Sequence, residues 1–121
     1  MPSRKNFYRR NMTTNKAIHA LSLARRAGKL SIGYQATQHA LISGRASLVV
    51  AARDISERTL NKAKKVGSGV LFVNAIFDQN EIQTVLGRRF AIAAVTDRNF
   101  SDLFIKAYED GSLPEEEIYD N

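Results

Sequence analysis

The sequence predicts an α/β fold: a three-layer α/β/α sandwich with a small mixed, mostly parallel sheet. Helical and extended patterns alternate along the chain, and the longer extended runs are apolar without polar alternation. An unbroken apolar strand is typical of a sheet covered on both faces, and strands that alternate with helices are typical of a parallel sheet. The 121 residues suit one domain, and no repeat of roughly 20–50 residues is present.

The first half of the chain contains two predicted helices and two predicted strands. Small apolar residues at helical spacing predict a helix from Asn15 to Ala27, which a glycine can end. A short extended piece, Lys29–Ile32, follows, and Gly33 then opens a second helix from Tyr34 to Ser43. The apolar run Ala46–Ala52 predicts a strand that is buried on both faces.

Two D-x-x-E patterns mark helix starts in the second half. In such a pattern the first side chain accepts the N–H of the fourth residue, whose side chain reaches back. Asp54 and Glu57 predict a helix through Lys65. Asp78 and Glu81 predict a short helix that the next glycine ends.

Two further apolar runs, Val70–Val73 and Phe90–Val95, predict buried strands. Thr96 or Asp97 caps the last helix, whose apolar residues keep helical spacing as far as Tyr108. The expected order is therefore helix, strand, helix, strand, helix, strand, helix, strand, helix.

The charge is distributed unevenly along the chain. Residues 1–53 contain ten Lys or Arg and no acid, whereas residues 54–121 contain eight basic and twelve acidic side chains. The two parts therefore carry +10 and −4, which sum to the net charge of +6. A long stretch of one sign favours a polyanionic partner, and nucleic acid is favoured over membrane because no segment joins this charge to a broad apolar face.

Three regions are expected from the composition and charge: residues 1–13 as a disordered basic N-terminal arm, residues 14–109 as a single α/β/α domain that binds nucleic acid, and residues 110–121 as an acidic C-terminal tail. The chain contains no cysteine, secretory signal or apolar run long enough to span a membrane. We therefore expect a cytoplasmic protein without disulfides or thiolate metal sites.

The sequence contains no pattern that predicts an enzyme. The glycine motifs of dinucleotide-binding and P-loop proteins are absent. No acid precedes Asp54, where a phosphate-accepting receiver domain needs carboxylates, and capping explains Asp54, Asp78 and Asp97. We expect no catalytic residue, no metal site and no cofactor.

The segment Lys29–His39 is the best candidate for a binding site. It places a helix N-terminus, whose N–H groups can donate hydrogen bonds to phosphate or base oxygens, beside a basic strand. Gly33 lets another backbone approach closely. The helix then offers hydrogen bonds and one stacking ring, from Tyr34, Gln35, Thr37, Gln38 and His39. A glycine N-cap followed by an ordinary polar helix surface explains the same spacing equally well.

Residues 15–108 carry a family resemblance. The pieces A-R-R-A-G-K-L, A-L-I-S-G-R-A, L-V-V-A-A-R-D and A-V-T-D occur in one order along the chain. This combination resembles the L7Ae/L30e superfamily of ribosomal and kink-turn RNA-binding proteins, in particular its bacterial YlxQ-like branch.

The resemblance implies a compact α/β/α fold that recognises RNA, typically a kink-turn with exposed sheared G·A pairs. In the family, the second helix begins G-x-[NK]-[EQ]-x-x-K and reads those pairs. Gly33 matches this pattern, and Gln35 keeps an amide at the third position. Ala36 lacks the polar group at the fourth position, and His39 replaces the lysine.

The resemblance implies two further contact regions: the loop that contains Arg88 and Arg89, and the turn Arg53-Asp54 after the second predicted strand. On a three-layer sandwich these loops and the start of the second helix can converge at one end. We expect phosphate contacts from Lys29, Arg53, Arg88 and Arg89.

The leading interpretation is a non-enzymatic protein, ribosomal or ribosome-associated, that binds structured RNA such as ribosomal RNA and is monomeric without it. Two alternatives remain open. The chain could be a substrate-recruiting module that works with an RNA-modifying enzyme, or a protein–protein scaffold.

Overall fold

Nine elements alternate along the chain in the predicted order. The structure, a computed structural model, describes residues 3–110, with side chains from Thr14 to Glu109. The elements are α1 (Ser3–Arg26), β1 (Leu30–Ile32), α2 (Tyr34–Ile42), β2 (Leu48–Ala51), α3 (Glu57–Val66), β3 (Leu71–Asn74), α4 (Gln79–Leu86), β4 (Ile92–Val95) and α5 (Arg98–Asp110).

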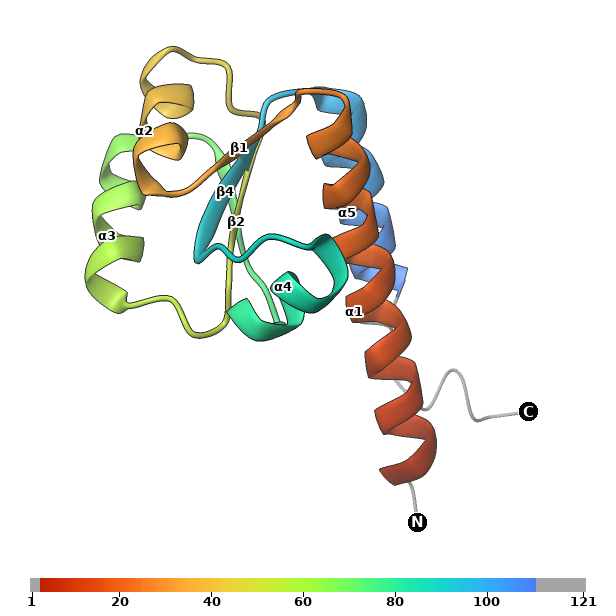
Figure 1. The fold of residues 1–121 in the computed structure, drawn as a ribbon. Coiled ribbons are helices and arrows are strands. Elements are labelled where there is room, and N and C mark those ends of the chain that lie inside the picture. Colours follow the sequence, from red (N-terminus) through yellow and green to blue (C-terminus); the bar gives the residue numbers. More distant parts are fainter. Residues whose placement is uncertain (1–2, 111–121) are drawn as a thin grey trace.

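The elements form three layers around a four-stranded sheet of order β1-β4-β2-β3 (Figure 1). Helices α1, α4 and α5 lie on one side, where Leu48 and Val50 of β2 pack in one core with Phe104. Helices α2 and α3 lie on the other side, where Val49 packs in a second core with Leu41. Alternate residues of β2 enter opposite cores, as the period of a strand requires. The predicted α/β/α sandwich is confirmed.

The sheet is mixed, and the prediction that it is mostly parallel was wrong. β2 and β3 are parallel, but β4 runs antiparallel to both of its neighbours, β1 and β2. The helix between β3 and β4 explains this difference. α4 lies at the end of the sheet where β3 ends (Figure 1), so the chain re-enters the sheet there. Ile92, the first residue of β4, lies opposite Ala51, the last residue of β2.

The central strands β2 and β4 are buried at every position, as predicted, whereas β3 is not. β3 is the last strand in the sheet order, so it has a neighbour on one side only, and Leu71 is 54% exposed. The hydroxyl of Tyr108 covers the end of this strand. It accepts the N–H of Ile76 at 3.1 Å and donates to the carbonyl of Asn74 at 3.4 Å, and burial raises the pKa of Tyr108.

The first helix begins earlier than expected. We expected residues 1–13 to be disordered, but the backbone is helical from Ser3. The segment from Ser3 to Thr13 contains neither glycine nor proline, so no residue interrupts the helix that leads into the domain. α5 ends at Asp110, and the rest of the predicted acidic tail, residues 111–121, lies outside the described residues.

An aromatic cluster joins α5 to the loop after β3. The ring of Phe104 is stacked on Tyr108 with centroids 5.6 Å apart, and it meets Phe77 edge-to-face at 6.4 Å. Phe104 is fully buried. Such pairs add to the free energy gained by burying the rings themselves.

We expect Phe104→Ala to lower the free energy of unfolding by about 3–5 kcal/mol, because it leaves a cavity at the centre of this cluster. Urea denaturation measures the change. The neighbouring side chain of Leu103 is 41% exposed, so Leu103→Ala provides the control and should cost much less. Equal losses in the two variants would show that the cluster does not stabilise the fold as described.

Candidate nucleic-acid interface

Three strands end, and the fourth begins, at one end of the sheet. After β1, Gly33 donates its N–H to the carbonyl of Ile92 at 2.9 Å. After β2, Arg53 donates its N–H to the carbonyl of Phe77, which follows β3, at 2.8 Å. We call this region the four-loop edge; it comprises residues 33, 52–56, 75–78 and 87–91. The start of α2, the turn after β2 and the loop before β4 are therefore brought together, as the sequence predicted.

The N-terminus of α2 lies at the four-loop edge without a side-chain cap. Gly33 precedes the helix with φ of 97° and ψ of 165°, a conformation that only glycine adopts readily. A Cβ built at this position would meet nothing within 4 Å, so the space beside the glycine is open. No side chain of the described residues caps the first turn of α2, so its N–H groups and their partial positive charge are available to an external acceptor.

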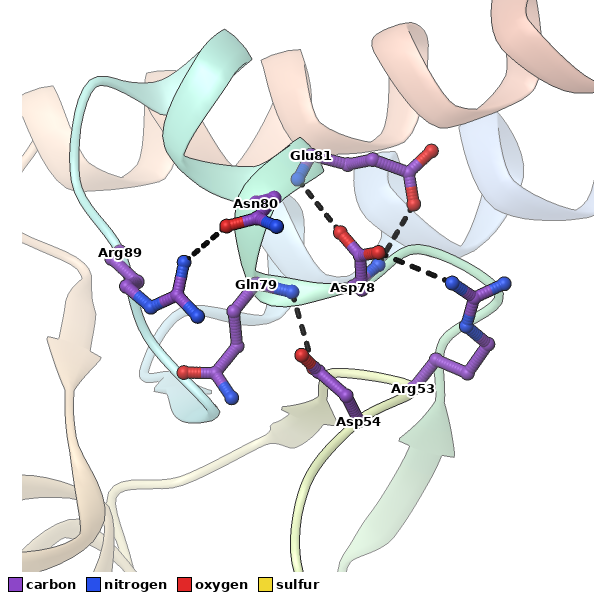
Figure 2. Close-up of polar contacts among 7 residues, drawn as sticks. All are labelled: Arg53, Asp54, Asp78, Gln79, Asn80, Glu81 and Arg89. Atoms are coloured by element: carbon purple, nitrogen blue, oxygen red, sulfur yellow. Dashed lines mark hydrogen bonds and ion pairs between the residues drawn. The ribbon is translucent and has the colours of Figure 1, made fainter.

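The predicted capping role of Asp54 was wrong. Because α3 begins at Glu57, its capping position is residue 56, and Ser56 Oγ accepts the N–H of Thr59 at 3.2 Å. Asp54 instead crosses to another helix. Its Oδ1 accepts the N–H of Gln79, the first residue of α4, at 3.1 Å (Figure 2).

The N-terminus of α4 is filled by carboxylates of the protein itself (Figure 2). Asp78 and Glu81 form the predicted capping box, in which each side chain accepts the other's backbone N–H at 2.9 Å. Arg53 donates to Asp78 Oδ2 at 3.1 Å. The hydrogen bond from the Glu81 N–H, followed by the charge of Arg53, lowers the pKa of Asp78 although burial opposes the shift. Of the two helix starts α2 and α4, only that of α2 is open to an external anion.

The three arginines predicted to bind phosphate differ in their contacts with the rest of the protein. The side chain of Arg53 is paired with Asp78 but remains 53% exposed, so part of its guanidinium faces solvent. Arg89 donates to the side-chain oxygen of Asn80 (Figure 2). Arg88 is exposed and makes no hydrogen bond or ion pair with the described part of the chain. Arg88 can therefore bind an external phosphate without first breaking an interaction with the described part of the chain.

The polar side chains of α2 lie on different faces of the helix. Gln35 and His39 are four residues apart and are both exposed, so they share one outer face, and Gln38 is partly exposed beside them. Tyr34 is partly buried against the second core, and Lys62 Nζ lies 5.4 Å from the centre of its ring. One face of the predicted stacking ring thus already contacts a cation.

Thr37 was wrongly predicted as a surface contact. It is fully buried, because it lies on the same face of α2 as Ala40 and Leu41, three and four residues further on. Its hydroxyl has no hydrogen-bond partner among the residues that the structure describes. Thr37 therefore positions the helix and cannot contact a ligand at the surface.

Lys29 does not lie at the four-loop edge. It precedes β1, and its carbonyl accepts the N–H of Thr96, which follows β4, at 2.9 Å. The three residues of β1, about 10 Å of extended chain, separate Lys29 from Gly33. Of the four cations predicted to contact phosphate, only the three arginines therefore lie at the four-loop edge.

The charge count by halves of the sequence did not identify the cations of α3. Arg58, Lys62 and Lys65 lie in the half with net negative charge, yet α3 packs beside α2 and Lys62 contacts Tyr34. Their i, i+4, i+7 spacing within a predicted helix was the signal that could have identified them.

Comparison with known proteins agrees with this geometry. A family model described as the Ribosomal protein L7Ae/L30e/S12e/Gadd45 family matches residues 15–111. The chain belongs to this family. The L7Ae family match includes the whole four-loop edge and begins within α1.

Similar proteins support the same assignment. The chain is 31% identical to the RNA-binding protein YlxQ of Enterococcus faecium over 87 residues, which cover 71% of this chain and 84% of that protein. A protein of unknown function from Bacillus halodurans has a solved structure that matches with a TM-score of 0.70 and 24% identity, over 78% of this chain and 97% of the other. The 15.5kD RNA binding protein of Giardia lamblia matches with a TM-score of 0.50 and 16% identity, over 82% and 83% of the two chains. The solved structures show that the L7Ae-type fold is shared.

The described residues contain neither a cluster of metal-ligating side chains nor a membrane-spanning helix. Within residues 3–110, no three His, Asp or Glu side chains lie close enough together to hold a metal ion. None of the helices in the described part combines the length and apolar character needed to cross a membrane.

The capping carboxylate makes stability depend on pH. Because the pKa of Asp78 in the fold is below its usual value of 3.8, its ionised form stabilises the fold above that value, and this contribution is lost as the pH falls through the lower, folded pKa. We expect Asp78→Asn to be less stable than the wild type at about pH 7 and the difference to shrink below about pH 4. Thermal unfolding across this range measures it. Asp102→Asn, at an exposed position on α5, is the control. A stability difference between Asp78→Asn and the wild type that does not change with pH would contradict the assignment.

The unpartnered hydroxyl gives a second prediction. We expect Thr37→Val to raise the free energy of unfolding by about 1 kcal/mol, since valine keeps the shape and removes a buried group without a hydrogen bond. Calorimetry would detect this as an increase of several degrees in Tm. Thr84 is exposed and its hydroxyl donates to the carbonyl of Asn80 at 2.9 Å, so Thr84→Val should give no such gain. A loss of stability in Thr37→Val would indicate that the hydroxyl has a partner.

Proposed function

We propose that this protein binds structured RNA at the four-loop edge, as a cytoplasmic ribosomal or ribosome-associated protein that needs no cofactor and catalyses no reaction. Residues 14–109 are the binding unit, which is monomeric without RNA. Family membership and the similarity to a protein named as RNA-binding support the partner class. The observation that carries the proposal is the open N-terminus of α2, which lies at the same edge as the unpaired cation of Arg88.

The groups at this edge divide into two kinds of contact. The N–H groups of the first turn of α2 and the guanidinium groups of Arg53, Arg88 and Arg89 bind phosphates. The side chains of Gln35, Gln38 and His39 offer donors and acceptors to base edges. Bases that are splayed out of a helix expose those edges, which is why structured RNA is favoured over a plain duplex.

A kink-turn or a related bend is the proposed target, because its sheared G·A pairs present base edges beside a sharply turned backbone. Ala36 contributes no polar group to this contact, so the amide of Gln35 becomes the main reader of the G·A pairs. His39 extends the same outer face of α2 where the family pattern has lysine.

Binding to two matched RNAs tests this proposal. The first is a hairpin with a kink-turn that contains two sheared G·A pairs; in the second, Watson–Crick pairs replace those two. We expect the first to bind more tightly, with a slope of about −3 to −5 in log affinity against log salt if roughly four to six phosphates are contacted. Gln35→Ala should weaken the kink-turn complex by roughly 1–3 kcal/mol, the range of a good bidentate base contact. Fluorescence anisotropy measures both quantities.

Matched variants distinguish the site from a general effect of charge. Arg88→Gln should reduce the salt slope by about 1. Arg98→Gln removes an arginine from α5, which begins at the other end of the sheet where β4 ends, and should leave the slope unchanged. If Gln35→Ala and His39→Ala bound the kink-turn as tightly as the wild type, the site would lie elsewhere.

A further inference from the structure

The outer face of α3 carries a stripe of cations that the four-loop edge does not include. Arg58, Lys62 and Lys65 recur at i, i+4 and i+7, so they line one side of the helix, with Lys64 beside them. All four are exposed. None of them forms an ion pair within the described part of the chain. We call Arg58, Lys62 and Lys65 the α3 stripe.

The stability of the helix does not explain the α3 stripe. Lysines in the last turn are favoured by the helix dipole, which accounts for Lys64 and Lys65. The same dipole opposes Arg58 in the first turn. Arg58 and Lys62 are also like charges at i, i+4, an arrangement that destabilises a helix. Neither the helix dipole nor pairing within α3 therefore accounts for Arg58 and Lys62, and the favourable contact described for them is that of Lys62 with the ring of Tyr34. Two exposed cations at this spacing favour an anionic partner outside the fold.

The position of α3 connects the stripe to the proposed RNA site. α3 follows residues 52–56 of the four-loop edge, so Arg58, in its first turn, is the member of the stripe nearest to that edge, and α3 packs beside α2. Lys62 Nζ lies 5.4 Å from the ring centre of Tyr34, the residue that follows Gly33. The three cations extend over about 10 Å of helix from this point.

The opposite face of α3 excludes a lipid surface as the better occupant. Ala63 is buried in the second core, and Val66 packs against the same core. Ala63 and Val66 are thus already covered by the sheet layer, Leu60 is partly buried, and the exposed residues of the helix are all charged or polar. A membrane-surface helix needs a free apolar face beside its charges.

We propose that the α3 stripe is a second RNA-binding surface, which follows the phosphate backbone of the helical segment that adjoins the RNA held at the four-loop edge. This inference rests on the proposed function for the identity of its partner. It adds contacts to phosphates only, so it contributes affinity without discriminating between sequences.

The test compares three forms of the full chain on two RNAs. The stripe variant is Arg58→Gln/Lys62→Gln/Lys65→Gln. The control, Lys16→Gln/Arg26→Gln/Lys106→Gln, removes the same charge from exposed positions on α1 and α5. The probes are the kink-turn hairpin and the matched RNA described above, in which Watson–Crick pairs replace the two G·A pairs and which we call the duplex. Thermal melts check the fold; the stripe variant should unfold at a temperature close to that of the wild type, since relief of the repulsion between Arg58 and Lys62 offsets the loss of the Lys62–Tyr34 contact and of the favourable dipole interaction of Lys65.

We expect the stripe variant to weaken binding to both RNAs and to lower the salt slope by about 2, since each lost phosphate contact removes roughly 0.7–0.9. Each lost contact should leave the affinity at about 1 M salt nearly unchanged and weaken binding at about 0.1 M salt roughly fivefold. The ratio of kink-turn to duplex affinity should stay unchanged. The control variant should alter the slope much less.

The outcomes separate the two proposals. If the stripe variant binds both RNAs as the control does, the stripe is not an RNA surface, although a preserved preference for the kink-turn would uphold the proposed function. If the wild type shows no such preference, the proposed reading of base edges fails, and weaker duplex binding by the stripe variant still supports the stripe. Loss of binding to phosphatidylserine vesicles without any loss of RNA binding would overturn the stripe proposal in favour of a lipid surface.

Discussion

The antiparallel insertion of β4 between β1 and β2 is the constraint on which the candidate interface depends. Ile92 lies opposite Ala51 at the end of β2, and Ala93 lies opposite Ile32 at the end of β1. If the chain had crossed the sheet before forming β4, residues 87–91 would lie at the other end, with Lys29. The arginines of that loop adjoin the start of α2 only because the strand runs in this direction.

Much of the fold is predictable from local sequence, because its elements depend on local patterns. Residues 46–52 and 90–95 are apolar without alternation, and both central strands are buried on both faces. Asp78 and Glu81 predicted a capping box that is present. The direction of β4, in contrast, cannot be predicted from a local sequence pattern. It depends on the end of the sheet to which α4 returns, and no spacing of residues within α4 encodes that.

The candidate site was predicted in position more accurately than in its individual contacts. Gly33, Gln35 and His39 follow from a glycine before a polar helix, and the four-loop edge contains the two turns expected to join them. Thr37 was placed on the surface because its side chain is polar. Its position on the same face of α2 as Ala40 and Leu41 indicates burial and should have decided the prediction. Asp54 was assigned to the nearest helix in sequence, whereas its partner belongs to one 25 residues away.

Three helices, α2, α3 and α4, begin at the four-loop edge. Each such start carries a partial positive charge of roughly half an elementary unit, which offsets part of the charge of a carboxylate that caps it. At a distance from the surface, Asp54 and Asp78 therefore contribute less negative potential than their formal charges suggest. The arginines beside them contribute their full positive charge. The edge is thus more positive than its formal charges indicate, which favours the approach of a polyanion to it before any contact forms.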